Sequence, residues 1–173
     1  MEIRDAIEHR LEVREFADEP VPDEDVRAVL DAARLAPSGI NRQHWHFVHV
    51  ADDGDLAALA ERSETGGWVA GADFAVVVCT DPEYDWHVLD AGRAVEHVCF
   101  AAADRGLGAC IYTGLDEAAT RKYLGVPDDM AVPVVVGVGV PAGDHLGTKD
   151  RKPLAEVASS GRYGESLDLA SDG

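Results

Sequence analysis

The chain has 173 residues, a length that suits one domain, and apolar residues make up 46% of it, which indicates a globular protein. It carries 15 Lys and Arg against 33 Asp and Glu, so its formal net charge is −18. Such a surface repels nucleic-acid phosphates and anionic lipids, and it argues against nucleic acid and membrane partners. Among the basic residues, only Lys122, Lys149 and Lys152 are lysines. An acid-rich, lysine-poor surface suggests a halophilic protein, kept soluble in concentrated salt.

The N-terminus and the cysteines favour a cytoplasmic protein. The opening MEIRDAIEHR is charged and amphipathic, unlike a signal peptide, and no apolar run approaches the roughly 20 residues that span a bilayer. Cys79, Cys99 and Cys110 are odd in number, lack CxxC spacing and lie in apolar runs. We therefore expect buried free thiols in a reducing cytoplasm rather than a disulfide or a metal site.

The first third of the chain is expected to begin with two helices. Apolar residues at helical spacing predict a helix over about residues 2–9. Pro22, followed by three acids, begins a second helix that Pro37 ends. The segment WHFVHV (45–50) then predicts a strand, and DLAALAERS (55–63) predicts a short helix.

The rest of the chain is expected to be richer in strands. Strands are predicted at 73–80, 109–114 and 131–140. The helix predicted over about 86–105 is apolar nearly all round and rich in small residues, so it should be buried on more than one side. A shorter helix follows, with Asp116 as its N-cap and Gly125 past its end.

These elements mix without regular βαβ alternation. We therefore predict an α+β fold in which a sheet is flanked by helices. Residues 1–160 are expected to form the single domain, and residues 161–173 a weakly ordered C-terminal tail.

Two clusters of cations stand out in this anionic chain. Arg10 and Arg14 are four positions apart, and GTKDRKP near the C-terminus contains Lys149, Arg151 and Lys152. Arg suits phosphate oxygens through its planar fork, and Lys acts as a point charge. For either cluster alone, a solvated basic patch or salt bridges to the abundant carboxylates would be sufficient.

A polar loop separates the second helix from the first strand. It reads APSGINRQHWHF (36–47), and Ser38, Asn41 and Gln43 offer donors and acceptors between two rigid elements. Helix capping and turn chemistry would explain Pro37 and Ser38 alone. Three such side chains followed by an aromatic residue exceed what a turn needs, and they would suit a flat polar ring.

Metal and dinucleotide motifs are not supported. On a strand, His44 and His46 share one face and His49 points to the other, which is poor geometry for a metal, so we expect none. The segment GVGVPAG (137–143) contains Pro141 and opens no helix, which excludes a Rossmann fingerprint.

Four segments together resemble the nitroreductase family of FMN-dependent oxidoreductases. They are RLEVREF (10–16), APSGINRQHWHF (36–47), DAGRAVEHVCFAAADRGLGAC (90–110) and KDRKPLAEV (149–157). The resemblance runs from about Ile3 to Val157. It implies a central, mostly antiparallel sheet flanked by helices, in an intertwined homodimer with FMN at the subunit interface.

The resemblance also assigns cofactor positions. They are Arg10, Leu11, Glu12, Arg14, Pro37, Ser38, Asn41, Gln43, Tyr112, Thr113, Gly114, Lys149 and Arg151. By this resemblance Arg10, Lys149 and Arg151 would hold the phosphate, and Arg14 would sit there or at the N1–O2 edge of the ring. The polar loop would contact the flavin or its ribityl chain, partly from the second subunit. The backbone of residues 112–114 would approach N5 and O4.

The sequence departs from the family pattern at several places. Leu11 and Glu12 stand where the family often has Arg or His and then Ser, so Glu12 must turn away from a phosphate or pair with a cation. His44 replaces the usual Pro. Trp68 is a candidate for the substrate pocket and equally a packing aromatic.

The resemblance implies an enzyme in which the flavin carries the chemistry and no catalytic side chain is required. NADH or NADPH would donate hydride, and an electron-poor nitroaromatic, quinone or enone would accept electrons in a ping-pong mechanism. The alternatives are reductive dehalogenation or oxygen-dependent flavin breakdown on the same scaffold, and a non-catalytic flavin-binding or anion-binding dimer.

The charge balance predicts salt-dependent folding. Yield on refolding should rise from dilute buffer to about 2 M KCl, because salt at or above 1 M shortens the Debye length to about 3 Å or less and screens the repulsion among carboxylates. Circular dichroism after refolding measures this yield. Full recovery in dilute buffer would contradict an adaptation to salt.

Overall fold

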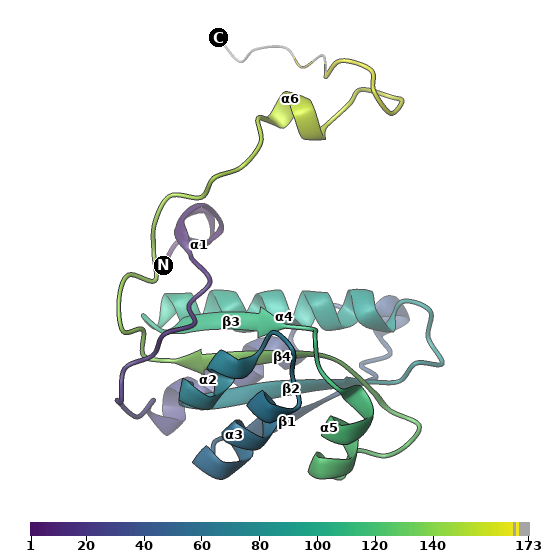
Figure 1. The fold of residues 1–173 in the computed structure, drawn as a ribbon. Coiled ribbons are helices and arrows are strands. Elements are labelled where there is room, and N and C mark those ends of the chain that lie inside the picture. Colours follow the sequence, from purple (N-terminus) through teal and green to yellow (C-terminus); the bar gives the residue numbers. More distant parts are fainter. Residues whose placement is uncertain (168, 170–173) are drawn as a thin grey trace.

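A four-stranded antiparallel sheet is the centre of the computed structural model, which describes residues 1–167 and 169. The strands are β1 (Trp45–Val50), β2 (Phe74–Thr80), β3 (Gly108–Tyr112) and β4 (Ala131–Gly139), in the order β1-β2-β4-β3. The helices are α1 (Ile3–His9), α2 (Asp23–Arg34), α3 (Asp53–Glu61), α4 (His87–Asp104), α5 (Glu117–Leu124) and α6 (Leu154–Val157). Single 3₁₀ turns, η1 (Gly39–Asn41) and η2 (Gly67–Gly71), complete the elements (Figure 1). The α+β prediction is confirmed.

The central strand β2 is buried along its whole length. Its sequence FAVVVCT is dominated by β-branched and small residues, which pack well when both faces of a sheet are covered. Phe74, Val76 and Val78 point into one core, and Ala75 and Val77 point into a second core on the other face. The sheet therefore lies between two apolar layers.

Each face of the sheet has its own helices. Helices α2 and α4 supply Val29, Val95 and Val98 to the first core. Helix α3 and the η2 turn supply Leu56 and Val69 to the second core. Figure 1 shows α4 running along one side of the sheet while α3 and α5 lie on the other. The buried residues of α4 form one broad stripe that faces the sheet and α2, and they include Ala91, Val95 and Val98. Burial on more than one side, expected from its small residues, is not seen in the single chain, where Val88 and Leu89 are exposed.

Polar capping residues determine where α3 and α5 begin, which the spacing of apolar residues does not reveal. Asp116 caps α5 through Ala119 N–H, and Gly125 ends the helix with φ +68°, both as predicted. The prediction for α3 was wrong by two residues, because Asp52 accepts hydrogen bonds from Gly54 and Asp55 N–H and starts the helix at 53.

The other differences from prediction are also at element ends. Strand β3 stops at Tyr112 rather than 114, because the Gly114 carbonyl accepts a hydrogen bond from Glu64 N–H instead of continuing the ladder. The second helix ends at Arg34, before Pro37. Of the tail expected at 161–173, residues 168 and 170–173 lie outside the described residues.

The three cysteines are buried and free, as expected from the sequence. Burial raises the pKa of Cys79 to about 11 and those of Cys99 and Cys110 to about 12. Thiols with such pKa values stay protonated near neutral pH and are poor nucleophiles.

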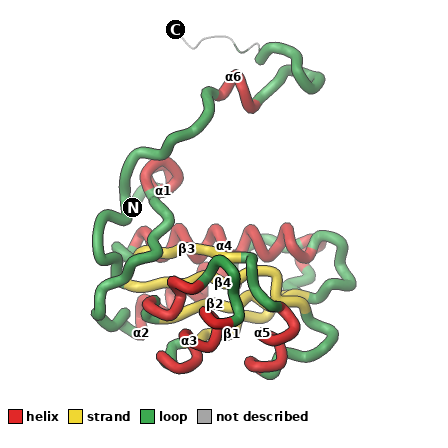
Figure 2. The backbone as a smooth tube through the Cα atoms, viewed as in Figure 1, coloured by secondary structure: helices red, strands yellow, loops and turns green. Residues whose placement is uncertain are grey.

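The C-terminal segment leaves the body of the fold. Figure 2 shows the chain running past α1 and away from the sheet to α6. Leu154 and Val157 of α6 are 62% and 63% exposed. In the part of the chain that the structure describes, no helix is both long and apolar enough to cross a membrane.

The Asp52 cap gives a stability prediction. Asp52→Ala should lower the free energy of unfolding by about 1 kcal/mol, since two backbone N–H groups lose their acceptor. Asp52→Asn is the matched control and should stay within a few tenths of a kcal/mol, because it keeps a side-chain oxygen. Urea unfolding measures both, and equal losses would contradict the cap.

Candidate functional site

Cations from opposite ends of the chain meet beside α1. Lys149 Nζ donates a hydrogen bond to the Ile7 carbonyl at 2.5 Å. Burial, and then the positive charges of Arg10 and Arg151, lower the pKa of Lys149. Arg10 and Arg151 are therefore both close enough to Lys149 to disfavour its charge, and an anion beside Lys149 would be stabilised.

Arg10 is the most buried of these cations and is shared between two carboxylates. Its Nη1 donates to Glu12 and its Nη2 donates to both oxygens of Glu96, all at 2.9 Å. Its Nε is buried and has no hydrogen-bond partner within the described residues. A buried donor without an acceptor costs free energy, so this atom has unused capacity to bind an oxygen.

Glu12 lies where a phosphate is expected, and it forms an ion pair with Arg10. Burial is the largest single influence and opposes its charge, but the hydrogen bonds from Arg10 and Cys110 and the positive charge of Arg10 together lower the pKa of Glu12. Its Oε2 also accepts from Ile111 N–H at 3.4 Å. The cluster of three cations and two carboxylates, Glu12 and Glu96, retains one net positive charge in a chain of −18.

The segment around residues 10–12 lies along the edge strand β3. Glu12 bridges Ala109 in parallel, and Leu11 N–H donates to the His145 carbonyl at 2.9 Å. Arg14 follows and is exposed. This segment covers an edge that would otherwise be open and places the cations close to the end of β3.

Residues 112–114 present backbone rather than side chains. The Tyr112 ring is buried, and burial raises its pKa to about 12. Thr113 is exposed. A Cβ at Gly114 would lie 2.7 Å from Thr65 Oγ1, so the glycine allows the turn around residue 65 to approach. Any ligand contact of Tyr112 would thus come from its main chain.

Trp68 packs against two aromatic rings, those of Tyr112 and Phe16. Its ring meets Tyr112 edge-on at 5.8 Å and Phe16 at 6.3 Å. A Cβ at Gly137 would lie 2.6 Å from the Trp68 ring. These contacts are those of a packing residue, and its part in a substrate pocket remains a prediction.

The polar loop is strained and its side chains face outward. Ile40, Asn41 and Gln43 have φ values of 46°, 58° and 50°, in the left-handed region that β-branched residues disfavour. Ser38 Oγ accepts from Gln43 N–H at 2.9 Å. The side chains of Asn41 and Gln43 are exposed, as is Pro37. Strain of this kind is concentrated at functional sites.

Two residues of α4 that tie these segments together were missed from the sequence. Glu96 holds Arg10, and Asp90 accepts a hydrogen bond from Gly39 N–H in the loop. The available signal for Asp90 was a charge on the apolar face of the helix, because a buried charge needs a partner. Glu96 is 45% exposed and carried no such signal.

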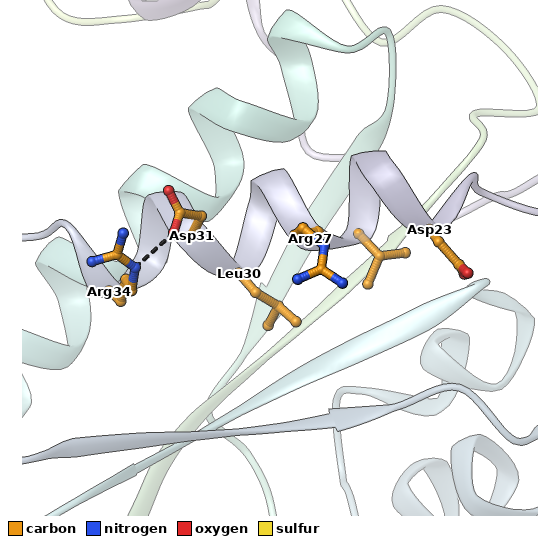
Figure 3. Close-up of a pocket in the computed structure, with 6 residues that line it drawn as sticks. Asp23, Arg27, Leu30, Asp31 and Arg34 are labelled. Atoms are coloured by element: carbon orange, nitrogen blue, oxygen red, sulfur yellow. Dashed lines mark hydrogen bonds and ion pairs between the residues drawn. The ribbon is translucent and has the colours of Figure 1, made fainter.

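One hollow on the surface lies apart from this site. It measures about 430 Å³ and lies along α2, where Figure 3 shows Asp23, Arg27, Leu30, Asp31 and Arg34. Arg34 already pairs with Asp31 at 2.6 Å. Its side chains come from a single helix and none belongs to the predicted set, so we assign it no role.

Comparison with known proteins identifies the fold. The model of the nitroreductase family matches residues 7–81 and 60–140. The chain belongs to the nitroreductase family. The family inferred from the four sequence segments is thereby confirmed.

Nitroreductase relatives cover most of the chain. A provisionally named NADH dehydrogenase/NAD(P)H nitroreductase of Archaeoglobus fulgidus is 36% identical over 157 residues, which is 86% of each chain. An iodotyrosine deiodinase of Thermotoga neapolitana is 28% identical and aligns with 79% of this chain and 87% of its own. A provisionally named nitroreductase of Desulfovibrio desulfuricans, solved in complex with FMN, is 33% identical with a TM-score of 0.82, over 91% of this chain and 95% of that one.

The residues present fit a flavin that carries a phosphate. The unpartnered Nε of Arg10 and the mutual repulsion of the cations near Lys149 would both be relieved by phosphate oxygens. The exposed amides of Asn41 and Gln43 can both donate to and accept from a polar ring.

The cation cluster gives a binding prediction. The double variant Arg10→Ala/Arg151→Ala should weaken FMN binding by at least about 100-fold, since each charge-assisted hydrogen bond contributes about 1.5–3 kcal/mol. Quenching of FMN fluorescence on titration measures the affinity. The control Arg27→Ala/Arg34→Ala on α2 makes the same change in net charge and should bind normally. Equal affinity in both double variants would refute the phosphate assignment.

Proposed function

We propose that this chain is an FMN-dependent oxidoreductase that uses NADH or NADPH to reduce electron-poor compounds such as nitroaromatics, quinones or enones. The observation that carries the proposal is the convergence of Arg10, Lys149 and Arg151 on one place in a nitroreductase-family chain. When bound, FMN supplies the hydride and electron chemistry. The protein supplies binding, orientation and charge.

The cations hold the phosphate and the loop holds the ring. Arg10, Lys149 and Arg151 bind phosphate oxygens, and exposed Arg14 lies near them or at the N1–O2 edge of the flavin. The backbone of residues 113 and 114 faces the N5 and O4 side. No side chain is needed as a general acid, because water reaches an open site and delivers protons.

We further propose that the active species is a homodimer with shared sites. The polar loop is tied to Asp90 and the cation cluster to Glu96, on the same helix. Asp90 and Glu96 are six positions apart. At about 100° per residue, this separation amounts to one full turn plus about 240°, so the two side chains leave α4 on different sides. The loop of one protomer and the cations of its partner would then serve one flavin.

Exposed apolar surface supports a second copy as the partner. Ile3 of α1 is 70% exposed, and a groove of about 310 Å³ between α1 and α4 includes Ile3, Ala6 and Phe100 in its lining. The C-terminal segment with α6 extends away from its own sheet (Figure 1). Apolar patches of this kind mark interaction sites. The extended C-terminal segment is suited to wrapping around the second protomer.

A second candidate function is reductive dehalogenation on the same scaffold. It is favoured by the 28% identity to an iodotyrosine deiodinase. Both functions use the same flavin site, so they differ only in the compound that accepts the electrons. The buried free thiols suit a reducing cytoplasm for either activity.

An absorbance spectrum tests the proposal. The purified protein should be yellow or should take up FMN, should sediment as a dimer, and should lose its visible absorbance when NADH or NADPH is added without oxygen. Steady-state rates with a quinone should give parallel double-reciprocal lines, because donor and acceptor bind alternately at one position. A protein that refuses FMN would refute the function, and a yellow protein inert to both nucleotides would indicate a non-catalytic flavin-binding dimer.

A further inference from the structure

A single buried carboxylate anchors the strained loop. Asp90 is 0% exposed and lies in the first turn of α4. Its Oδ2 accepts from Gly39 N–H at 2.8 Å and lies 3.1 Å from His44 Nε2. Its Oδ1 accepts from Arg93 Nη1 at 3.0 Å. Since a carboxylate only accepts, Nε2 of His44 is the donor in that contact.

Two of these three partners bracket the loop. Gly39 and His44 lie immediately before and after Ile40–Gln43, the segment that contains the three left-handed residues. Each such residue costs on the order of 1 kcal/mol or more unless the surroundings hold it in place. Ile40 is also 78% exposed, so packing does not hold it. Inside the loop, Ser38 Oγ accepts from Gln43 N–H and the Gly39 carbonyl accepts from Arg42 N–H. The bonds of Asp90 add to these by fixing the two ends of the segment to α4.

The Asp90–His44 pair, called the anchor below, is shielded from solvent and closely packed. The His44 side chain is only 3% exposed, and its ring lies 5.2 Å from that of Tyr84. A Cβ at Gly39 would lie 2.2 Å from Trp86 Nε1, so only glycine allows this approach. Hydrogen bonds to a charged group are stronger where water is excluded. The structure also leaves His44 Nδ1 buried without a partner in the described chain, a cost that the bond to Asp90 must offset.

We propose that Asp90 and His44 are positioning residues that preorganise the loop for FMN. This inference rests on the proposed function. Held from both ends, the loop presents Ser38, Asn41 and Gln43 in one arrangement before the ligand arrives. A ligand that binds an ordered loop does not have to supply its ordering entropy, so affinity rises.

The proposal differs from a purely structural role for Asp90. Arg93 Nη1 donates to the same carboxylate from within α4, three positions along the same helix, so this bond does not join the loop to the helix. If Asp90 only stabilised the helix or the core, losing Arg93 or losing His44 would have similar consequences. If Asp90 positions the loop, only the loss of His44 changes loop order and flavin affinity.

The test compares His44→Phe with Arg93→Gln in the full-length protein. His44→Phe keeps an aromatic ring beside Tyr84 and removes the bond to Asp90. Asp90→Ala would remove the whole anchor and with it the buried charge, so failure to fold would be uninformative. Hydrogen exchange of the loop amides is measured without FMN, and FMN affinity is then measured by titration on the same samples.

We expect His44→Phe to speed exchange at Gly39–Gln43 and to weaken FMN binding, each by about tenfold, because a loop released at one end must be ordered again when the ligand binds. Arg93→Gln should stay within about twofold in both. At FMN saturation, the visible circular dichroism of the flavin should change in His44→Phe only.

Three results would overturn the proposal. They are unchanged exchange in His44→Phe, equal changes in the two variants, and faster exchange with unchanged FMN affinity. If the wild-type protein itself does not bind FMN, the proposed function fails. The exchange comparison without FMN still reports separately whether the anchor orders the loop.

Discussion

The structure depends on holding positive charges together inside a strongly negative chain. Arg10, Lys149 and Arg151 come from the two ends of the sequence. Arg10 is paired with Glu12 and Glu96, while Lys149 feels burial and the charges of Arg10 and Arg151, which the two carboxylates only partly offset. Such an arrangement is stable without a ligand because the carboxylates share Arg10. It also remains selective for anions, because one positive charge is left over. A nucleotide-type cofactor can thus be bound by a protein whose overall field repels anions.

Helix α4 is the element on which both halves of the site are mounted. Its small residues let it pack deeply against β2 and β4, which fixes its position. Asp90 and Glu96 are the charged exceptions on this helix that hold the loop and the cation cluster. In the proposed dimer, this one buried helix would therefore position the loop of one flavin site and the cations of the other.

Sequence analysis found the elements and the family but not the contacts that join them. Apolar spacing identified all four strands and the first five helices, because burial imposes it, whereas α6 and the two 3₁₀ turns were not expected. The start of α3 was misplaced because three aspartates, Asp52, Asp53 and Asp55, stand near the start of that helix, and only the structure shows that Asp52 is the cap. The bond from Gly39 to Asp90 spans 51 positions, and the Arg10–Glu96 pair spans 86. Pairings of that range follow from the folded topology, which local patterns do not encode.

The burial of Cys79, Cys99 and Cys110 has a consequence for an enzyme that handles electrons. Thiols with raised pKa values, inaccessible to solvent, cannot drain reducing equivalents into disulfides or sulfenic acids. The cysteines are therefore poor competitors for the electrons that the flavin carries. Sulfhydryl reagents would find nothing to label on the native molecule and three groups once it unfolds.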